Sequence, residues 1–291
     1  MRDGFINFLK PPGMSSHDAV GCARRVLGLK KAGHAGTLDP GAAGVLPIAV
    51  GRATRLLEYI GGTRKAYRAE LRFGKETDSG DDLGGIVAES DAPFPDVETL
   101  ARAVRSLTGE ISQIPPIYSA VKIGGRRACD LARQNAAVEL PPRRVTIYRL
   151  EVLARNEEER TLLLDVECSK GTYIRSLCRD LGRAAGIPAT MSFLVRTRVG
   201  DFQLDRAHTP EELAVLGEAA VEPPETCLGC LPRCELPEAR RTAFLNGLST
   251  RLPGAAGAAG PLAIFAGGAF LGIGRYDAAS SSLVPDKVYE N

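Results

Sequence analysis

Long apolar runs are missing from this sequence, and no stretch approaches the roughly 20 consecutive apolar residues that a membrane-spanning helix needs. The first six residues, Met1 to Ile6, are too polar to form the apolar segment of a secretory signal. No internal similarity recurs at the spacing of roughly 20–50 residues that marks repeat proteins. These absences predict a cytoplasmic protein that works without a membrane.

Excess charge of one sign is also missing, because 37 lysines and arginines nearly balance 35 aspartates and glutamates. The molecule as a whole is therefore not a polycation. If the chain binds nucleic acid, its positive charge must be concentrated on one face. Apolar residues make up 44% of the 291 residues, which is enough for the cores of one large domain and a small one.

The seven cysteines do not form a recognisable metal-binding pattern. Cys227 and Cys230 make one CxxC pair and Cys234 follows, but the second pair that a structural zinc site normally shows is missing. Cysteine is also a common buried small residue. Without a secretory segment, we expect reduced thiols, no metal and no cofactor.

A glycine-rich loop at residues 33–45 presents a histidine, His34, and a carboxylate, Asp39, directly before a proline. The apolar residues from Val45 to Val50 follow and predict a buried strand. Glycines allow backbone shapes closed to other residues and let a ligand approach the main chain. Asp-Pro-Gly is also ordinary turn chemistry, so this loop alone does not establish a catalytic site.

The whole segment decides between these interpretations. It reads His34-Ala-Gly-Thr-Leu-Asp-Pro-Gly-x-x-Gly-x-Leu-Pro and continues through Gly51-Arg-Ala-Thr-Arg55. It closely resembles the signature of the tRNA pseudouridine-55 synthases, the stand-alone bacterial branch of a pseudouridine synthase family that also has RNA-guided members. The resemblance covers nearly the whole chain and implies that Asp39 is the catalytic residue.

Three further side chains are assigned to a base pocket by the same resemblance. Tyr67 lies in a strand predicted at Thr63–Phe73, where a half-buried tyrosine is common, and the resemblance implies that it stacks on the target base. Tyr173 belongs to the run Lys170-Gly-Thr-Tyr-Ile-Arg175 and would line the pocket. Leu194, in a strand predicted at Met191–Phe202, falls where the family has an apolar pocket residue.

Arg175 is the residue that the resemblance pairs with the catalytic carboxylate. The pattern from Ser169 to about Gly186 predicts a helix, and an arginine on a helix is usually solvated. A guanidinium beside Asp39 would keep that carboxylate ionised and oriented without a metal.

Two residues near the loop have less certain roles. Lys10 begins a Lys-Pro-x-Gly-x-Ser-Ser segment that borders the active site in the family, although a surface lysine would look the same. His34 could fill the space that the target base vacates, or it could be a structural histidine bonded to backbone.

A basic stretch at about 122–145 contains little acid and surrounds a Gly-Gly pair, which favours a lobe that grips phosphates. In the family this region is a thumb over the RNA. Ala128-Cys129 departs from the Leu-Tyr usual there. The basic residues are Lys122, Arg126, Arg127, Arg133, Arg143 and Arg144.

An acidic loop at 74–85 partly fits a calcium-binding template, but Leu83 stands where that template needs glycine, and its flanks predict strands. The spelling Thr77-Asp-x-x-Asp-x-x-Gly84 instead matches the family, where it is a hairpin connection. A boundary follows at Glu222-Pro-Pro-Glu, and from Pro232 to Asn291 the chain is β-rich and resembles the PUA RNA-binding module that ends these synthases.

We therefore expect an α+β protein with a mixed, mainly antiparallel sheet flanked by helices. Residues 1–231 would form the catalytic domain and 232–291 a small β-rich PUA-like domain. The implied activity is isomerisation of uridine to pseudouridine in the tRNA T-loop, at position 55. The uridine must be extruded before chemistry. Attack by Asp39 on the ribose, attack on the base, and removal of a sugar proton all stay open.

The expected partner is the T-arm of tRNA, bound by a monomer that needs no protein partner. Two alternatives remain, an RNA-guided relative and a non-catalytic protein that binds or folds tRNA. The stand-alone spelling at Gly44-Val-Leu-Pro argues against the first. The presence of Asp39, Tyr67 and Arg175 together argues against the second.

Overall fold

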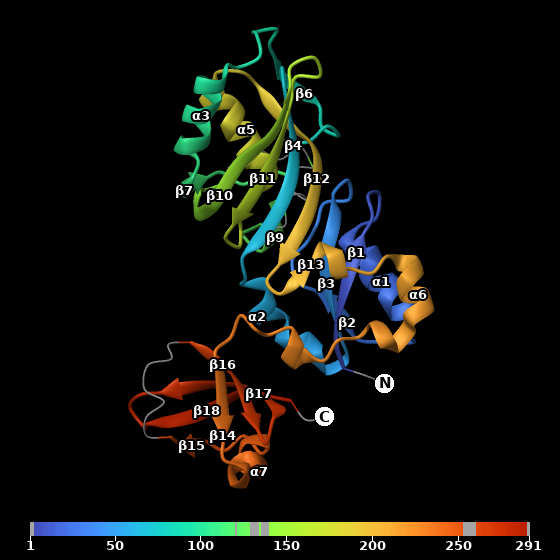
Figure 1. Cartoon of the computed structure of the whole chain (residues 1–291), viewed down its shortest axis with the longest axis vertical. Coiled ribbons are helices and arrows are strands. Elements are labelled where there is room, and N and C mark those ends of the chain that lie inside the picture. Colours follow the sequence, from blue (N-terminus) through green and yellow to red (C-terminus); the bar gives the residue numbers. More distant parts are fainter. Residues whose placement is uncertain (1–2, 120, 129–133, 135–139, 253–259, 290–291) are drawn as a thin grey trace. The chain divides into compact units, whose positions relative to one another are not determined.

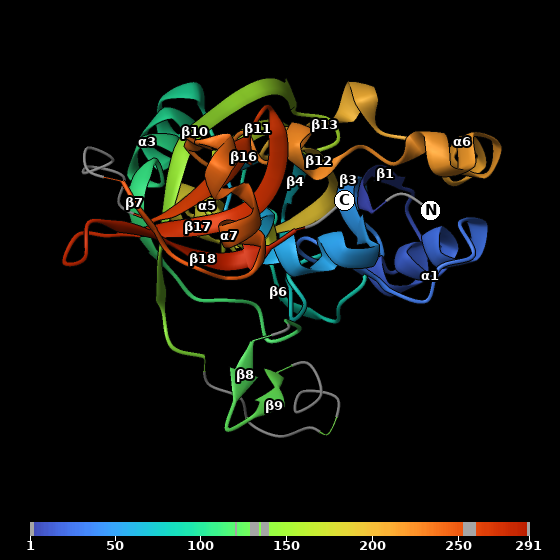
Figure 2. The same cartoon turned by 90° about the horizontal axis from the view of Figure 1, so that it is seen from below.

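The computed structural model describes residues 3–119, 121–128, 134, 140–252 and 260–289 (Figures 1 and 2). The chain divides into two compact units. The first consists of residues 1–40, 44–63 and 199–291, and the second of residues 41–43 and 64–198.

The first unit begins with a pair of antiparallel strands in which β1 runs against β3, from Gly4 opposite Val50 to Lys10 opposite Gly44. The short β2 pairs with the other edge of β3. Helix α1 starts after Ser15. The spacing of Ser15 and Asp18 in the sequence predicts a capping box, and their reciprocal bonds confirm it. The elements of this part are β1 (Gly4–Lys10), α1 (Ser16–Val26), β2 (Ala32–His34), β3 (Ala43–Val50), the 3-10 helix Gly51–Leu56, α2 (Leu57–Gly61), β13 (Phe202–Gln203) and α6 (Pro210–Leu216).

The sequence predicts a helix at about Ala53–Ile60, and the structure differs from that prediction. A 3-10 helix covers Gly51–Leu56, and α2 occupies only Leu57–Gly61. Its turns still bury Leu56, Tyr59 and Ile60 on one side, so the apolar spacing that suggested a helix is used for packing.

A five-stranded sheet forms the C-terminal part of the first unit, in the order β14-β16-β17-β18-β15. The pair β14 and β16 is parallel, and the other pairs are antiparallel. The apolar runs between glycines predict strands around 262–265, 270–273 and 283–284. All three lie within observed strands, which confirms a β-rich C-terminal part. Its elements are β14 (Arg233–Leu236), α7 (Arg241–Leu245), β15 (Thr250–Arg251), β16 (Pro261–Ala266), β17 (Ala269–Asp277) and β18 (Ser282–Val288).

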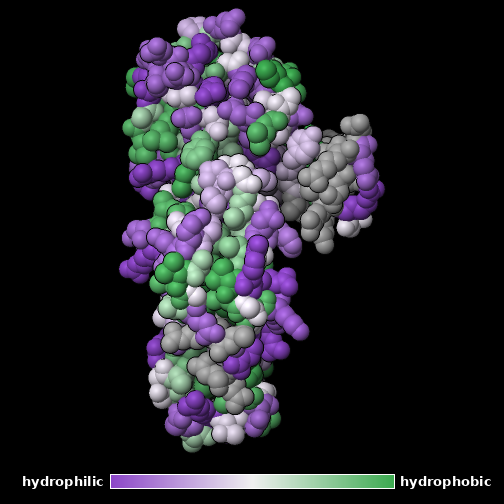
Figure 3. Space-filling view, turned by 90° about the vertical axis from the view of Figure 1, so that its right-hand side faces the viewer, coloured by the Kyte–Doolittle hydropathy of each residue, from purple (hydrophilic) through white to green (hydrophobic). Residues whose placement is uncertain are grey.

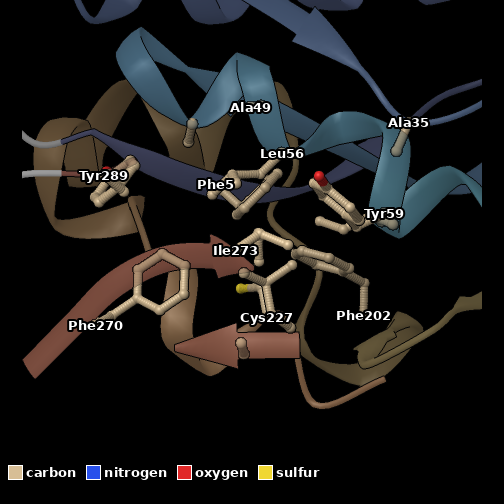
Figure 4. Packing of buried hydrophobic residues seen from close by; sticks show 14 of the residues in the cluster. Phe5, Ala35, Ala49, Leu56, Tyr59, Phe202, Cys227, Phe270, Ile273 and Tyr289 are labelled. Carbon is tan, nitrogen blue, oxygen red and sulfur yellow. The ribbon is translucent and has the colours of Figure 1, made fainter. Parts of the chain in front are cut away.

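One hydrophobic core joins this sheet to the N-terminal strands (Figure 4). Phe5, Leu56 and Phe202 contribute from one side, and Phe270 and Ile273 contribute from the other. A hydrogen bond accompanies this packing, in which the Tyr59 hydroxyl donates to the Asp286 carboxylate at 3.0 Å. The boundary at 231/232 stays a prediction.

The second unit is built on strands in the order β12-β4-β11-β10-β7. Strand β11 runs antiparallel to both β4 and β10, and β10 runs antiparallel to β7. Helices α3 and α5 pack against each other, and α5 also packs on β4. The elements are β4 (Lys65–Phe73), β5 (Lys75–Thr77), β6 (Ile86–Glu89), α3 (Val97–Ser106), β7 (Gly109–Gln113), β8 (Lys122–Ile123), β9 (Arg126–Arg127), β10 (Arg143–Asn156), β11 (Thr161–Cys168), α5 (Ile174–Ala185) and β12 (Ala189–Val199).

The α+β class with mainly antiparallel sheets is thus confirmed. The sequence of β4 places Tyr67, Ala69, Leu71 and Phe73 on one side of the strand by alternation. All four are buried, as this pattern predicts. Helix α5 begins at Ile174 rather than at Ser169, because Gly171 has a φ of +83° inside a turn that precedes the helix. In the part of the chain that the structure describes, no helix has the length and apolar character to cross a membrane.

Candidate active site

The backbone around Asp39 is fixed from both sides. Asp39 is partly exposed in the loop between β2 and β3. On its N-terminal side, the buried Ser16 hydroxyl accepts from the Leu38 N–H at 2.9 Å and donates to the Leu38 carbonyl at 3.0 Å. On its C-terminal side, the Pro40 carbonyl accepts the Gly13 N–H at 2.8 Å. The carboxylate therefore projects from a loop whose main chain has little freedom.

Lys10 contributes to the same loop from the end of β1. Its side chain is fully buried, and its ammonium donates to the carbonyls of Pro11 at 2.9 Å, Met14 at 2.6 Å and Pro40 at 3.2 Å. A buried ammonium is costly unless its hydrogens are bonded, and these carbonyls supply acceptors. Lys10 thus ties the turn after β1 to the residue that follows Asp39.

His34 is the last residue of β2 and lies opposite Ile48 of β3. It is partly buried, and the backbone beyond it is held by a bond from the Ala35 N–H to the Pro47 carbonyl at 2.9 Å. His34 therefore lies where β2 ends and the loop that carries Asp39 begins.

In the second unit, a buried glutamine fixes the start of α5. The Gln113 side-chain oxygen accepts the Tyr173 N–H at 2.8 Å, and its amide nitrogen donates to the Tyr173 carbonyl at 3.1 Å. Tyr173 is the N-cap of α5 but has no capping side-chain bond of its own. Its side chain packs against a small cluster of Val121, Ala128 and Leu140.

Arg175 is the second residue of α5 and is only 5% exposed. Its two terminal nitrogens donate to different carbonyls, those of Ser79 and Tyr118, each at 2.8 Å. The Asp81 carboxylate lies 3.8 Å from one of these nitrogens. The planar guanidinium is therefore held in one orientation by groups from two other segments.

Tyr67 and Leu194 lie on neighbouring strands of the same sheet. Tyr67 is 6% exposed on β4, opposite Val166 of β11, and Leu194 is 5% exposed on β12.

A cavity of about 540 Å³ also opens in this unit beside α5. Arg175, Arg179 and Arg183 line it on the helix side, and Ile114 and Ile117 line it with apolar surface.

The basic residues of the expected thumb are described only in part. Arg126 is exposed and its guanidinium bonds to Gln134, and Arg143 and Arg144 are exposed at the start of β10. Lys122 and Arg127 lie on the β8–β9 hairpin, but their side chains, like the whole of Arg133, fall outside the described part of the chain. On the face in Figure 3, hydrophilic residues are interspersed with small apolar areas.

The acidic segment at 74–85 joins β5 to β6, as its match to a hairpin connection predicted. Two of its carboxylates accept backbone N–H groups within the hairpin, Asp78 from Gly85 at 2.9 Å and Asp81 from Leu83 at 3.1 Å. Burial raises the pKa of the Cys227 thiol to about 12, so this thiol is neutral at physiological pH. Among the described residues, no group of three His, Cys, Asp or Glu side chains is placed to hold a metal ion.

Comparison with known families accounts for most of the chain. Residues 24–174 match the model for the N-terminal domain of TruB family pseudouridylate synthases, and residues 175–228 match a C-terminal domain of tRNA pseudouridylate synthase B. The chain belongs to the TruB family. The resemblance carried by the 33–55 segment is thereby confirmed.

Curated TruB relatives agree over most of their length. The chain is 52% identical to tRNA pseudouridine synthase B of Symbiobacterium thermophilum, over 85% of this chain and 83% of the relative. It is 46% identical to the protein of that name from Caldanaerobacter subterraneus subsp. tengcongensis, over 84% and 85% of the two chains.

Solved structures give the same fold. A chain from the crystal structure of a Cbf5-Nop10-Gar1 complex superposes with a TM-score of 0.76 at 28% identity, covering 99% of this chain and 84% of that one. A chain from the structure of an H/ACA RNP bound to a substrate RNA containing 2′-deoxyuridine gives 0.75 at 26% identity, over 99% and 85%.

Sequence analysis did not single out Ser16, Gln113 or Asp81. The serine was visible only as part of the Ser-Ser pair before α1, and the aspartate only as part of a hairpin. Gln113 carried no signal, because its partner Tyr173 lies 60 residues away.

Proposed function

We propose that this chain isomerises uridine to pseudouridine in the T-loop of tRNA, at position 55, with Asp39 as the catalytic residue. The observation that carries the proposal is the loop at 33–45. It combines the family signature with a carboxylate whose flanking residues, Leu38 and Pro40, are both tied down by hydrogen bonds. A preorganised acid of this kind suits a reaction in which one group must meet the sugar–base bond.

The reaction detaches uracil from ribose at a ring nitrogen and reattaches it through a ring carbon, with no change of oxidation state. Asp39 would act as nucleophile on the ribose or the base, or as a base at the sugar. Because bases in a folded loop are stacked, the target uridine must first be extruded.

The other residues take roles around that carboxylate. Arg175 would keep the catalytic carboxylate ionised, and its buried, fixed guanidinium supports this role. Tyr67 would stack on the extruded base, with Tyr173 and Leu194 completing the pocket. His34 would fill the vacated stack. Lys10 is best assigned as a positioning residue, since its ammonium bonds to the carbonyl that follows Asp39.

RNA backbone binding is assigned to the basic segment and to the C-terminal part. Exposed Arg126, Arg143 and Arg144 would contact phosphates of the T-arm, together with Lys122, Arg127 and Arg133. Residues 1–231 would serve as the catalytic domain and 232–291 as a PUA-like RNA-binding domain. We propose that the protein acts as a cytoplasmic monomer without a protein partner.

The test is to incubate the purified protein with an unmodified tRNA transcript and to map pseudouridine by position. Product confined to position 55, formed by the protein alone, is expected. Product that appears only with an added guide RNA and partner proteins would favour the RNA-guided alternative. No product under either condition would favour a binding or folding role.

The matched variant is Asp39→Ala. It should reduce product formation by at least about a thousandfold, as loss of a nucleophile does in other enzymes, while tRNA binding stays near wild type. Substantial turnover by this variant would show that the catalytic assignment is wrong.

A further inference from the structure

A cluster of cations lies at one end of the sheet in the second unit, where the mechanism above assigns no residue. Lys65 is the first residue of β4, and its register partner is Cys168, the last residue of β11. Lys170 is exposed in the turn that follows β11. Arg196 lies on β12, the other neighbour of β4, and is 1% exposed. The neighbouring strands β4 and β12 thus carry Lys65 and Arg196, and the turn after β11 adds Lys170 at the same end of the sheet.

These charges act on one another. Burial, with the charges of Arg196 and Lys170, lowers the pKa of Lys65 to about 8. Burial raises the pKa of the Cys168 thiol to about 11, so this neighbour is neutral at pH 7 and gives Lys65 no counter-charge there. A lysine whose pKa is lowered in this way favours binding of an anion, because a negative charge beside it stabilises its charged form.

The nearest carboxylates on β11 are engaged by other arginines. Glu167 lies 3.6 Å from Arg64 and 2.9 Å from Arg198. The next carboxylate along β11, Asp165, forms ion pairs with two arginines, Arg68 and Arg149. Because successive side chains alternate between the faces of a strand, Glu167 also points away from the face of Cys168.

The cluster adjoins the pocket residues of the same unit. Lys65 and Tyr67 are two residues apart on β4 and therefore share a face, with their Cα atoms about 6–7 Å apart. Leu194 and Arg196 have the same relation on β12. An aromatic side chain such as Tyr67 can stack on the base of a nucleotide while a neighbouring cation binds its phosphate.

We propose that Lys65 and Lys170 bind an RNA phosphate next to the nucleotide that stacks on Tyr67, with the buried Arg196 adding its charge from beneath. The inference rests on the proposed function in that it takes the ligand to be tRNA. It adds a phosphate subsite and a residue, Lys65, whose protonation governs affinity.

A lysine that merely packs its alkyl stem against the sheet would behave differently. Replacing it with methionine would keep the stem and leave RNA binding unchanged. Replacing it with arginine would then disturb packing without any effect on the pH dependence of binding.

The experiment measures the dissociation constant for unmodified tRNA as a function of salt and pH, in an Asp39→Ala background so that no turnover occurs. Lys65→Met should weaken binding about tenfold at pH 7 and reduce the slope of log affinity against log salt by about 0.7–1. Lys65→Arg should bind like the parent at pH 7. Arg102→Met, which removes a cation that pairs with Glu98 on α3, is the control and should leave the slope near the parent value.

The pH profile is the second readout. Phosphate binding favours the charged form of Lys65, so affinity is present below pH 8 and falls as pH rises from about 8 to 9.5. The groups that face Lys65 are Cys168, whose thiol pKa is raised by burial to about 11, and the cations Lys170 and Arg196. Lys65→Arg keeps its charge and should remove this fall in affinity.

Unchanged affinity, salt slope and pH profile in both Lys65 variants would overturn the inference, whatever the outcome for turnover. Failure of the proposed function would appear separately, as absence of pseudouridine with the wild-type protein. If Lys65→Met does not fold, the pH profile of Lys65→Arg still decides the question.

Discussion

The Asp39 loop in the first unit and the start of α5 in the second are both held by buried polar side chains that bond to backbone. They differ in how far along the chain those side chains come from. Ser16 and Lys10 reach the loop across 22 and 30 residues. The bonds that fix Tyr173 and Arg175 span between 57 and 96 residues.

This difference matters for how each region forms. The loop is fixed once β1, the turn after it and α1 are in place, so its anchors belong to one short stretch of chain. The start of α5 depends on groups from the β5–β6 hairpin and the segment after β7, which meet only when the sheet of that unit is complete. Substitutions in the second unit should therefore disturb the start of α5 more than they disturb the loop that carries Asp39.

The largest effect after loss of Asp39 is expected for Arg175→Lys. Lysine keeps the charge but cannot donate to the Ser79 and Tyr118 carbonyls in the same fixed fork, so the cation becomes misplaced. Turnover should fall about a hundredfold, with a smaller change in tRNA affinity. Single-turnover kinetics with saturating enzyme would measure this, and activity close to wild type would show that the orientation of the guanidinium is unimportant.

A smaller loss is expected for Lys10→Met, which tests the loop in the first unit. Methionine fills a similar volume but leaves the carbonyls of Pro11, Met14 and Pro40 without this donor. Hydrogen bonds from a charged donor contribute about 1.5–3 kcal/mol each, so their loss should lower stability, and turnover should drop about tenfold or more. Urea unfolding and turnover at saturating tRNA would be measured together.

The double variant Lys10→Met with Ser16→Ala sharpens this prediction. If both side chains hold the same loop, their effects on turnover should not be additive. Simple multiplication of the two effects would indicate that they act on different parts of the unit.

Gln113→Leu tests the corresponding clamp in the second unit. It removes both bonds to Tyr173 and should lower turnover about three- to tenfold and destabilise the protein by about 1–3 kcal/mol. Gln113→Glu is the matched control, because its carboxylate still accepts the Tyr173 N–H but cannot donate to the carbonyl. An intermediate effect is expected for the control, and equal effects of the two variants would contradict a two-bond clamp.

The smallest effect is expected on stability for Lys65→Met. The pKa of Lys65 in the folded protein, about 8, lies below the value of 10.5 that an exposed lysine has. Burial of the charged lysine therefore destabilises the folded protein at pH 7. As pH rises from about 8 to 10.5, folded Lys65 loses its proton before the unfolded chain does, and this cost disappears.

Lys65→Met should therefore melt a few degrees higher than wild type at pH 7, with the difference shrinking toward pH 10. Comparing the two proteins at each pH cancels the shared contribution of the buried cysteines. A variant that is less stable than wild type at pH 7 would mean that the lysine supports the fold.

Much of the local structure followed from the sequence. The bonds between Ser15 and Asp18 start α1 where the spacing of those residues predicted it. The alternation in β4 correctly predicted that Tyr67, Leu71 and Phe73 would be buried. Both succeed because capping and alternation depend on residues within a few positions of each other.

Other features could not be predicted in this way. An arginine on a helix is usually solvated, and nothing in the local pattern around Arg175 indicates the tertiary contacts that leave it 5% exposed. The start of α5 was placed too early, because the turn at Gly171 interrupts an otherwise helical pattern. The common core of the C-terminal sheet and the N-terminal strands joins residues as far apart as Phe5 and Tyr289, for which no local pattern exists.

The sequence by itself determined the family, several of the strands and helices, and the loop that carries Asp39. It did so because those properties are written in short motifs and in the periodic spacing of apolar residues. Only the tertiary structure decided which side chains hold that loop and α5 in place, and which cations gather around Lys65. Burial and charge at a site depend on segments that the fold brings together, and a linear spacing does not record them.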